Sequence, residues 1–518
     1  MADQGSVLAT AALPVEKSVV VIGAGTMGSG IAEVAALAGH RVYLRDTSDA
    51  ALERGIAQIC RSLDKRVERG RLEQAQRDAI VARLKPVNAT GALEEVGLVI
   101  EVIVENLDVK VAVLSQIESE VGPDTIIATN TSSLSVTAIA GRLSRPDRVA
   151  GMHFFNPATV LPLVEVIGGA ATAPEVTRTL FETAKAWGKV PVLCRSTPGF
   201  IVNRVARPYY GEALRLLQEQ ATTPATLDAV MRECGGFKMG PCELMDLIGH
   251  DVNFAVTKSV YEAFFDDPRY KPSLVQKDLV DAGWLGRKSG HGFFDYREGA
   301  IPPMPDDAGA RAAVPGTVRI EGHLGPAAAL GDLLSRQAEI AVERRDGIGL
   351  VRVDGFALAL SDGRTATERS LALGEPVVLF DLALDYAACS RVALAAAAQC
   401  SDEHLAKAVG LFVQLGKKVS VLADAPGLAV MRSVAMLVNE AADAVHQGIA
   451  SADDVDAAMR KGVNYPLGPM AWGQHIGIGH VGTVLRHLAQ AYGEDRYRTS
   501  LWLQRAVHAT QALGAEHG

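Results

Sequence analysis

The 518-residue chain lacks the features typical of disulfide-rich, membrane-spanning and nucleic-acid-binding proteins. Its six cysteines are scattered, with no CxxC pair and no Cys/His cluster at metal-ligand spacing. This pattern favours a reducing compartment and predicts no metal site. Basic residues are not in excess, and the net charge of −9 argues against a general nucleic-acid partner. No apolar run is long enough to cross a membrane, so we expect a cytoplasmic protein.

Residues 1–16 have neither a basic start nor a sustained apolar core. They are therefore predicted to be a flexible arm rather than a signal peptide. At about 100–200 residues per domain, the length predicts three or four domains.

A nucleotide-binding βαβ unit is predicted at residues 17–46, KSVVVIGAGTMGSGIAEVAALAGHRVYLRD. Residues 18–22 are rich in valine and isoleucine, as expected for a strand of a parallel sheet. Gly23, Gly25 and Gly28 then form G-x-G-x-x-G. In this motif the glycines permit a tight turn, close approach of a pyrophosphate, and packing of the helix on the sheet. Phosphates would lie at the N-terminus of the following helix.

The end of the second strand favours NAD as the cofactor. Asp46 follows that strand, where a carboxylate can accept hydrogen bonds from a ribose 2′-hydroxyl and would repel a 2′-phosphate. Arg45 is the opposing signal, because an NADP site would use a guanidinium.

Three further strand-like segments bring polar residues to the carboxyl edge of the predicted sheet. They are GLVIEV at 97–102, DTIIATN at 124–130 and RVAGMHF at 148–154. Glu105 follows the first, and Ser132 follows the second. His153 is placed at the end of the third. Ligands of doubly wound folds bind at this edge.

His153 and Glu165 are the candidate catalytic pair. A lone histidine is more often structural, but a turn at Asn156-Pro157 would return the chain so that Glu165 lies beside it. A carboxylate fixes the imidazole tautomer and makes the ring a better base. Such a pair beside a nicotinamide could remove a hydroxyl proton as hydride leaves the same carbon. Ser132 and Asn203 could hydrogen-bond the oxygen.

Residues 49–84 show helical spacing and a basic segment, SLDKRVERGRL. Two interpretations remain open. The basic residues form either a solvated helix face or a surface on which Arg61, Lys65 and Arg69 contact a phosphorylated substrate.

Several longer motifs make the sequence similar to the L-3-hydroxyacyl-CoA dehydrogenases. They are VIGAGTMGSGIA, VENLDVK, ATNTSSL, GMHFFNPATVLPLVEV, TPGFIVNR and LGRKSGHGFFDY, spread over residues 18–296. The resemblance implies His153 as base and Glu165 as its partner, with Ser132 and Asn203 in the same catalytic set. It also implies NAD-side positions and CoA-side positions. On the NAD side these are Gly23, Gly25, Thr26, Met27, Gly28, Asp46, Glu105, Lys110, Ser132, Asn156 and Lys288. On the CoA side they are Ser62, Lys65 and Lys110.

Residues 197–298 are predicted to form a helical domain, within which Pro208 should interrupt the first long helix. Residues 299–316, rich in Pro, Ala and Asp, are predicted to be a linker.

After the linker the chain repeats itself. Residues 425–445 align with 197–217 without a gap, so each position of the first copy has a counterpart at a constant offset. At this offset Pro198 aligns with Pro426. Asn203 aligns with Met431, so the second copy has lost the catalytic amide.

The predicted fold is therefore a doubly wound α/β Rossmann domain (17–196), an all-α domain (197–298), a reduced Rossmann-like domain (317–423) and a second helical copy (424–518). In single-copy relatives the helical domain makes the homodimer contact. We therefore expect the two copies to form an intramolecular pseudo-dimer, with further homo-oligomerisation still open.

The function expected from this resemblance is NAD-dependent oxidation of an L-3-hydroxyacyl-CoA. A short or dicarboxylic chain is favoured, such as 3-hydroxybutyryl-CoA or 3-hydroxyadipyl-CoA in fatty-acid or aromatic degradation. Two alternatives remain: a dehydrogenase of a non-CoA hydroxy acid or sugar acid, and an NAD-binding sensor without turnover.

Overall fold

The computed structural model describes residues 11–87, 93, 95–313, 315–337 and 340–515. The chain divides into two compact units. Unit 1 contains the described residues up to Asn203 together with Gly448–Val463, and unit 2 contains Arg204–Gln447 and the described residues from Asn464 onward. The predicted flexible arm falls partly outside the described residues. Its described end is not loose, because Leu13 is buried and its N–H donates to the Thr183 hydroxyl.

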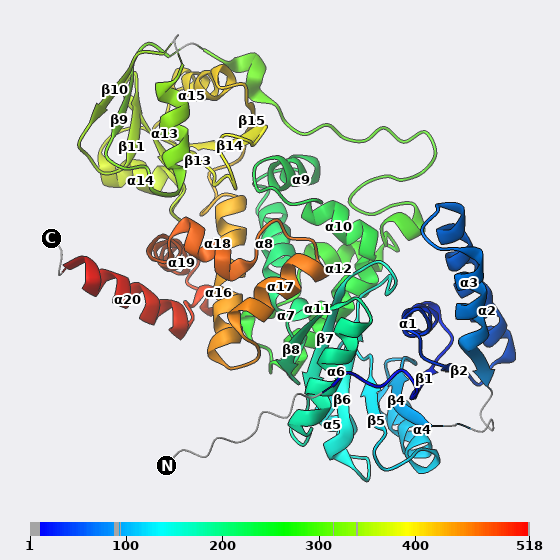
Figure 1. Ribbon diagram of the computed structural model, residues 1–518. Coiled ribbons are helices and arrows are strands. Elements are labelled where there is room, and N and C mark those ends of the chain that lie inside the picture. Colours follow the sequence, from blue (N-terminus) through cyan, green and yellow to red (C-terminus); the bar gives the residue numbers. More distant parts are fainter. Residues whose placement is uncertain (1–10, 88–92, 94, 314, 338–339, 516–518) are drawn as a thin grey trace. The chain divides into compact units, whose positions relative to one another are not determined.

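Unit 1 is built on an eight-stranded sheet of order β3-β2-β1-β4-β5-β6-β7-β8 (Figure 1). Neighbouring strands are parallel except β6 and β7, which are antiparallel. The strands are β1 (Ser18–Ile22), β2 (Val42–Arg45), β3 (Leu84–Val87), β4 (Val96–Glu101), β5 (Ile126–Thr129), β6 (Val149–Phe154), β7 (Leu163–Gly168) and β8 (Val190–Arg195).

Helices cover both faces of this sheet because strand side chains alternate between them. Val19 and Val21 join one core with α1, α2, α3 and α6, whereas Val20 and Ile22 join another with α4 and α5. The predicted doubly wound fold is confirmed. The helices are α1 (Thr26–Leu37), α2 (Asp49–Glu68), α3 (Gln74–Arg83), α4 (Leu107–Glu120), α5 (Val136–Ala140), η1 (Pro146–Arg148), α6 (Pro174–Ala186), α7 (Val202–Val205) and α17 (Ala452–Gly462).

Unit 2 contains a second, seven-stranded sheet of order β10-β9-β11-β12-β13-β14-β15, with mixed strand directions. Its elements are β9 (Val318–Glu321), η5 (Gly325–Ala327), α13 (Ala328–Ser335), β10 (Val342–Arg345), β11 (Leu350–Val353), β12 (Phe356–Leu360), α14 (Ala366–Leu373), β13 (Val377–Phe380), β14 (Arg391–Ala396), α15 (Asp402–Gln414) and β15 (Lys418–Val421). The sequence repeat extends into this sheet, since β13, β14 and β15 begin at the counterparts of the first residues of β6, β7 and β8.

The remaining helices of unit 2 come from the two helical copies. They are α8 (Arg207–Gln218), α9 (Pro224–Glu233), α10 (Pro241–Ile248), α11 (His250–Ala263), η2 (Pro268–Tyr270), α12 (Leu274–Asp281), η3 (Arg287–Ser289), η4 (Ala308–Arg311), α16 (Val430–His446), α18 (Pro469–Ile476), α19 (Ile478–Tyr492), η6 (Asp495–Tyr497) and α20 (Leu501–Ala515). Pro208 stands in the first turn of α8, after a break that separates it from α7. The sequence predicted this interruption.

Each helical copy contributes one helix that packs on the sheet of the other half of the chain. In unit 1, α17 of the second copy packs on β7 and β8, and the Arg195 N–H donates to the carbonyl of Ile449. In unit 2, α9 of the first copy packs on β14, and the Ala423 N–H donates to the carbonyl of Ala221. The two hydrogen bonds join equivalent positions, because the offset of the sequence repeat pairs Arg195 with Ala423 and Ala221 with Ile449.

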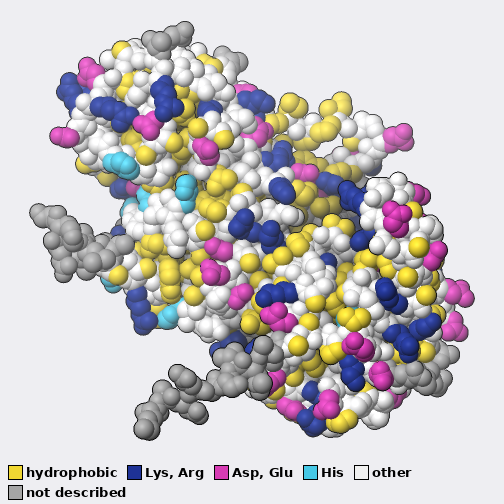
Figure 2. All heavy atoms as spheres, viewed as in Figure 1, with side chains coloured by type: hydrophobic (Ala, Val, Ile, Leu, Met, Phe, Trp, Pro, Cys, Tyr) yellow, Lys and Arg dark blue, Asp and Glu magenta, His cyan; other side chains and the backbone are white. Residues whose placement is uncertain are grey.

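No helix among the described residues has the length and apolarity needed to cross a membrane. Within the same residues, no group of three or more His, Cys, Asp and Glu side chains could hold a metal ion. On the face shown in Figure 2, basic and acidic side chains are interspersed.

Candidate active site

The glycine-rich turn joins β1 to α1 in unit 1. Gly23 has a φ of +109°, a conformation that favours glycine. A Cβ at Gly28 would collide with the carbonyl oxygen of Gly23, so this glycine permits the helix to pack closely. A Cβ at Gly25 would meet no atom within 4 Å, which leaves the open approach that a pyrophosphate needs. α1 follows at Thr26 and has no acidic residue in its first turn, so its partial positive charge is available to an anion.

Asp46, directly after the neighbouring strand β2, stabilises this turn through hydrogen bonds. Its carboxylate accepts hydrogen bonds from the N–H groups of Ala24, at 2.8 Å, and Ser48, at 3.0 Å. Arg45 is ion-paired with Glu120. A cavity of 110 Å³ lies here, lined by Ile22, Gly23, Arg45, Asp46, Thr47, Ile103, Val113, Gln116 and Ile117. Its walls are mainly apolar, and the Asp46 carboxylate is among the lining residues.

His153 and Glu165 lie opposite each other on adjacent strands. β6 and β7 pair antiparallel with His153 in register with Glu165, and Nδ1 of the imidazole is 2.7 Å from Oε2 of the carboxylate. The predicted contact is present. His153 lies within β6 rather than at its end, because pairing with β7 continues through Phe154. With Nδ1–H donating to Glu165, the lone pair of the other ring nitrogen, Nε2, is left to accept a proton.

Glu165 also holds the start of the next helix. Its Oε1 accepts hydrogen bonds from the N–H groups of Ile201 and Val202, at 3.0 and 2.9 Å. The next residue is Asn203, whose amide lies 3.4 Å from the carbonyl oxygen of Ser132. One buried carboxylate thus links the imidazole to the segment that carries the amide. The four predicted catalytic residues are therefore connected within unit 1.

Glu105 organises the loop that contains Ser132. Its Oε1 accepts from the hydroxyl of Thr131 and from the N–H groups of Ser132 and Ser133. Burial raises the pKa of Glu105, but these hydrogen bonds and the charge of Lys110 outweigh it and leave the pKa lowered. The carboxylate is therefore ionised at neutral pH.

Lys110 is 1% exposed, and its ammonium contacts two carboxylates, Glu101 at 2.7 Å and Glu105 at 3.3 Å. Glu101 also accepts from the hydroxyl of Thr129. The sequence interpretation missed Glu101. Its signal was a charged residue at the end of the otherwise apolar strand GLVIE.

Of the predicted CoA-side residues, Ser62 and Lys65 lie on α2, whereas Lys110 lies on α4. The Ser62 hydroxyl donates to the buried Glu33, whereas Lys65 is exposed and can extend its ammonium to solvent. Arg61 and Arg69 are exposed. The geometry leaves these cations, rather than Ser62, to meet an anionic ligand.

Two of the predicted NAD-side residues, Asn156 and Lys288, lie outside both the glycine-rich turn and the cluster of Glu105 and Lys110. Asn156 is exposed in the turn between β6 and β7. Lys288 belongs to unit 2, where it is ion-paired with Asp251. Thr26 and Met27 open α1.

The second sheet has no catalytic pair at the corresponding place. The residues that correspond to His153 and Glu165 are Asp381 and Ala393. Asp381 accepts from the N–H groups of residues 429–431, so it replaces Glu165 in holding the helix start. Burial raises the pKa of Asp381 to about 6, against these hydrogen bonds. The second half of the chain therefore keeps a buried carboxylate that holds the helix start, but it has no histidine at this place to act as a base.

Comparison with protein families matches most of the chain. Residues 18–197 match the NAD-binding domain of 3-hydroxyacyl-CoA dehydrogenase, and 199–296 and 427–518 each match its C-terminal domain. Residues 358–426 match the reduced Rossmann-fold domain of 3-hydroxybutyryl-CoA dehydrogenase. The chain belongs to the 3-hydroxyacyl-CoA dehydrogenase family. The predicted duplication is confirmed by the two C-terminal-domain matches.

Individual relatives agree with the family assignment. The chain is 47% identical to the 3-hydroxyadipyl-CoA dehydrogenase of Escherichia coli K12, over 95% of this chain and 98% of that protein. It is 39% identical to the human mitochondrial hydroxyacyl-coenzyme A dehydrogenase over 54% of this chain and 91% of that protein. The crystal structure of a 3-hydroxybutyryl-CoA dehydrogenase from E. coli K12 superposes with a TM-score of 0.87 at 44% identity. The match covers 97% of this chain and 100% of that one. The chain is thus an NAD-dependent 3-hydroxyacyl-CoA dehydrogenase.

Proposed function

We propose that this dehydrogenase oxidises a short dicarboxylic L-3-hydroxyacyl-CoA, 3-hydroxyadipyl-CoA, to its 3-oxo form. The relative that bears this substrate in its name is similar over nearly the full length of both chains, including the duplicated half. The second candidate substrate is 3-hydroxybutyryl-CoA, favoured by the name of the solved structure that matches nearly the whole chain. Aromatic-compound or fatty-acid degradation would supply such substrates.

The observation that carries the chemistry is the buried His153–Glu165 pair at 2.7 Å. In the proposed mechanism, Nε2 of His153 takes the proton of the 3-hydroxyl group while Glu165 stabilises the imidazolium that forms. NAD, when bound, supplies the hydride acceptor. Ser132 and Asn203 hold the substrate oxygen as it becomes a carbonyl. In reduction, protonated His153 returns the proton.

The residues that would hold NAD are those of the turn, Gly23, Gly25 and Gly28, with the start of α1 for the pyrophosphate. Asp46 would hold the ribose. Glu105 would act by fixing the loop at Ser132. Lys65 on α2 would contact the phosphates of CoA.

The test is a substrate panel assayed by NADH formation. It includes L-3-hydroxyadipyl-CoA, L-3-hydroxybutyryl-CoA, L-3-hydroxyhexanoyl-CoA and free 3-hydroxyadipate. We expect the highest kcat/KM with 3-hydroxyadipyl-CoA. A higher value with the butyryl substrate would favour the second candidate. Turnover of the free acid without CoA turnover would favour a non-CoA dehydrogenase, and no turnover of any compound would leave only the NAD-binding sensor.

A further inference from the structure

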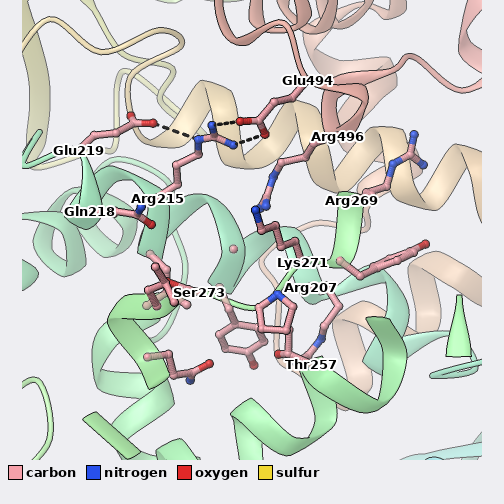
Figure 3. Close-up of a pocket in the computed structure, with 17 residues that line it drawn as sticks. Arg207, Arg215, Gln218, Glu219, Thr257, Arg269, Lys271, Ser273, Glu494 and Arg496 are labelled. Atoms are coloured by element: carbon pink, nitrogen blue, oxygen red, sulfur yellow. Dashed lines mark hydrogen bonds and ion pairs between the residues drawn. The ribbon is translucent and has the colours of Figure 1, made fainter. Parts of the chain in front are cut away.

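A basic cavity lies among the helices of unit 2. It has a volume of 220 Å³ and is lined by segments of α8, α11, η2 and α12 together with Glu494 and Arg496. The volume is below the range usual for drug-sized ligands, so the cavity suits a small group or a small molecule. Figure 3 shows its polar lining.

Arg207 distinguishes this cavity from an ordinary gap between helices. It is 6% exposed, and its Nε has no hydrogen-bond partner among the described residues. Its Nη1 donates to the hydroxyl of Thr257 at 3.0 Å, and its guanidinium lies 4.8 Å from the ring centre of Tyr210. No ion pair of Arg207 occurs within the described part of the chain. A buried cation without a carboxylate is costly, and an anionic ligand would remove that cost.

The other charges of the lining do not neutralise Arg207. The two carboxylates that line the cavity, Glu219 and Glu494, both bind Arg215. In Figure 3 this group lies at the top of the view, and Arg207 with Thr257 lies below it. Arg269 and Arg496 are held by carboxylates outside the lining, Glu440 and Glu212. Lys271, also in the lining, is exposed. The part of the cavity around Arg207 and Lys271 therefore carries positive charge.

The second helical copy shows that the helical fold does not require this arginine. At the offset of the sequence repeat, Arg207 corresponds to Ala435 and Thr257 to Leu485, both fully buried. The copy that retains Asn203 has the polar pair, and the copy that has lost Asn203 has an apolar one. Arg207 also follows Asn203 closely in the sequence.

We propose that the Arg207 cavity binds a carboxylate. The ligand is a free carboxylic acid that is small enough for a cavity of 220 Å³. The carboxylate would accept hydrogen bonds from the guanidinium, with Lys271 adding favourable charge.

The test compares the wild-type enzyme with the double variant Arg207→Ala/Thr257→Leu, which reproduces the pair found in the second copy, and with Arg207→Lys. Each protein is titrated with adipate by calorimetry, and the uncharged adipamide is the control ligand. We expect the association constant for adipate to fall by about 10–100-fold in the double variant, as for the loss of a charged hydrogen bond. Arg207→Lys should restore part of this affinity.

No adipate binding to the wild type, or binding that is unchanged in the double variant, overturns the proposal. If the double variant does not fold, Lys271→Gln provides the same readout with a smaller expected change. Adipate binding is measured without turnover, so the result does not depend on the proposed function.

Discussion

Arg204 and Glu440 form a buried ion pair, with 2.6 Å between Nε and Oε1, and the chain contains its mirror pair. At the offset of the sequence repeat the roles exchange, and Arg432 binds Glu212 at 2.7 Å. All four residues lie in unit 2 and are at most 1% exposed. Tyr270 and Tyr497 donate hydroxyl hydrogen bonds to the same two carboxylates. Such reciprocity is the property of a two-fold symmetric interface, here formed within one chain.

Glu440→Gln should destabilise the protein strongly. The change removes the buried one of the two carboxylates that Arg204 and Arg269 share and leaves only Asp443. Breaking a buried pair typically costs about 3–5 kcal/mol. The free energy of unfolding from denaturant titration measures this cost. Glu494→Gln is the control, since Glu494 pairs with Arg215 at a site where its side chain is 45% exposed, and the expected cost is at most about 1 kcal/mol. Equal effects of the two changes would contradict the account of a buried network.

Acid should destabilise the same network at a defined pH. Burial raises the pKa of Glu212, but Arg496 and Arg432 outweigh it and lower the pKa from 4.5 to about 2. A carboxyl group whose pKa is lowered by folding stabilises the fold above its unfolded pKa. That contribution is lost as the pH falls from about 4.5 to about 2. Unfolding free energies measured across this range should show a steeper slope for the wild type than for Glu212→Gln. Parallel curves would show that Glu212 contributes nothing to the acid sensitivity.

Truncation after residue 298 should produce a dimer or an aggregate. The truncated chain loses the partner of α8 and also α17, which packs on β7 and β8 of unit 1. Obligate interfaces commonly bury about 2,000 Å² or more, so the uncovered surface would exceed what soluble monomers tolerate. In a homodimer, α9 of one copy could take the place of α17 on the other. Light scattering is the measurement, and a monodisperse, fully active monomer would exclude the pseudo-dimer.

Asp46 should make the enzyme prefer NAD. Its carboxylate lies at the end of β2 and would repel a 2′-phosphate, and Arg45 is engaged by Glu120. We expect a clearly higher kcat/KM for NAD than for NADP, with Asp46→Ser narrowing the difference. Equal efficiency in the wild type would indicate that Arg45 leaves Glu120 and faces the ribose.

The sequence predicted the site best where an apolar strand pattern leads directly to the polar residues that carry the chemistry. β1, β4, β5 and β6 are apolar runs followed by the turns that carry polar residues, and His153 and Glu165 met as expected. β3 was missed because Lys85 and Pro86 interrupt its pattern. An edge strand tolerates proline, and β3 is the outermost strand of its sheet.

Features that depend on distant segments could not be predicted. The position of α17 on the first sheet is set by tertiary packing rather than by local pattern. Asp381 likewise gave no signal, because a carboxylate that replaces both members of a His–Glu pair is evident only from its backbone donors. Arg207 looks like an ordinary helix residue until its burial and lack of a carboxylate partner among the described residues are known.

The most direct test of the account is the turnover of His153→Gln with the preferred acyl-CoA substrate. Glutamine keeps a polar side chain but cannot act as a base, so kcat should fall by roughly 10²–10⁴-fold. NADH affinity, measured by fluorescence titration, should change little, because the glycine turn and Asp46 are untouched. Near wild-type turnover of His153→Gln would contradict the account and assign the proton transfer to another group.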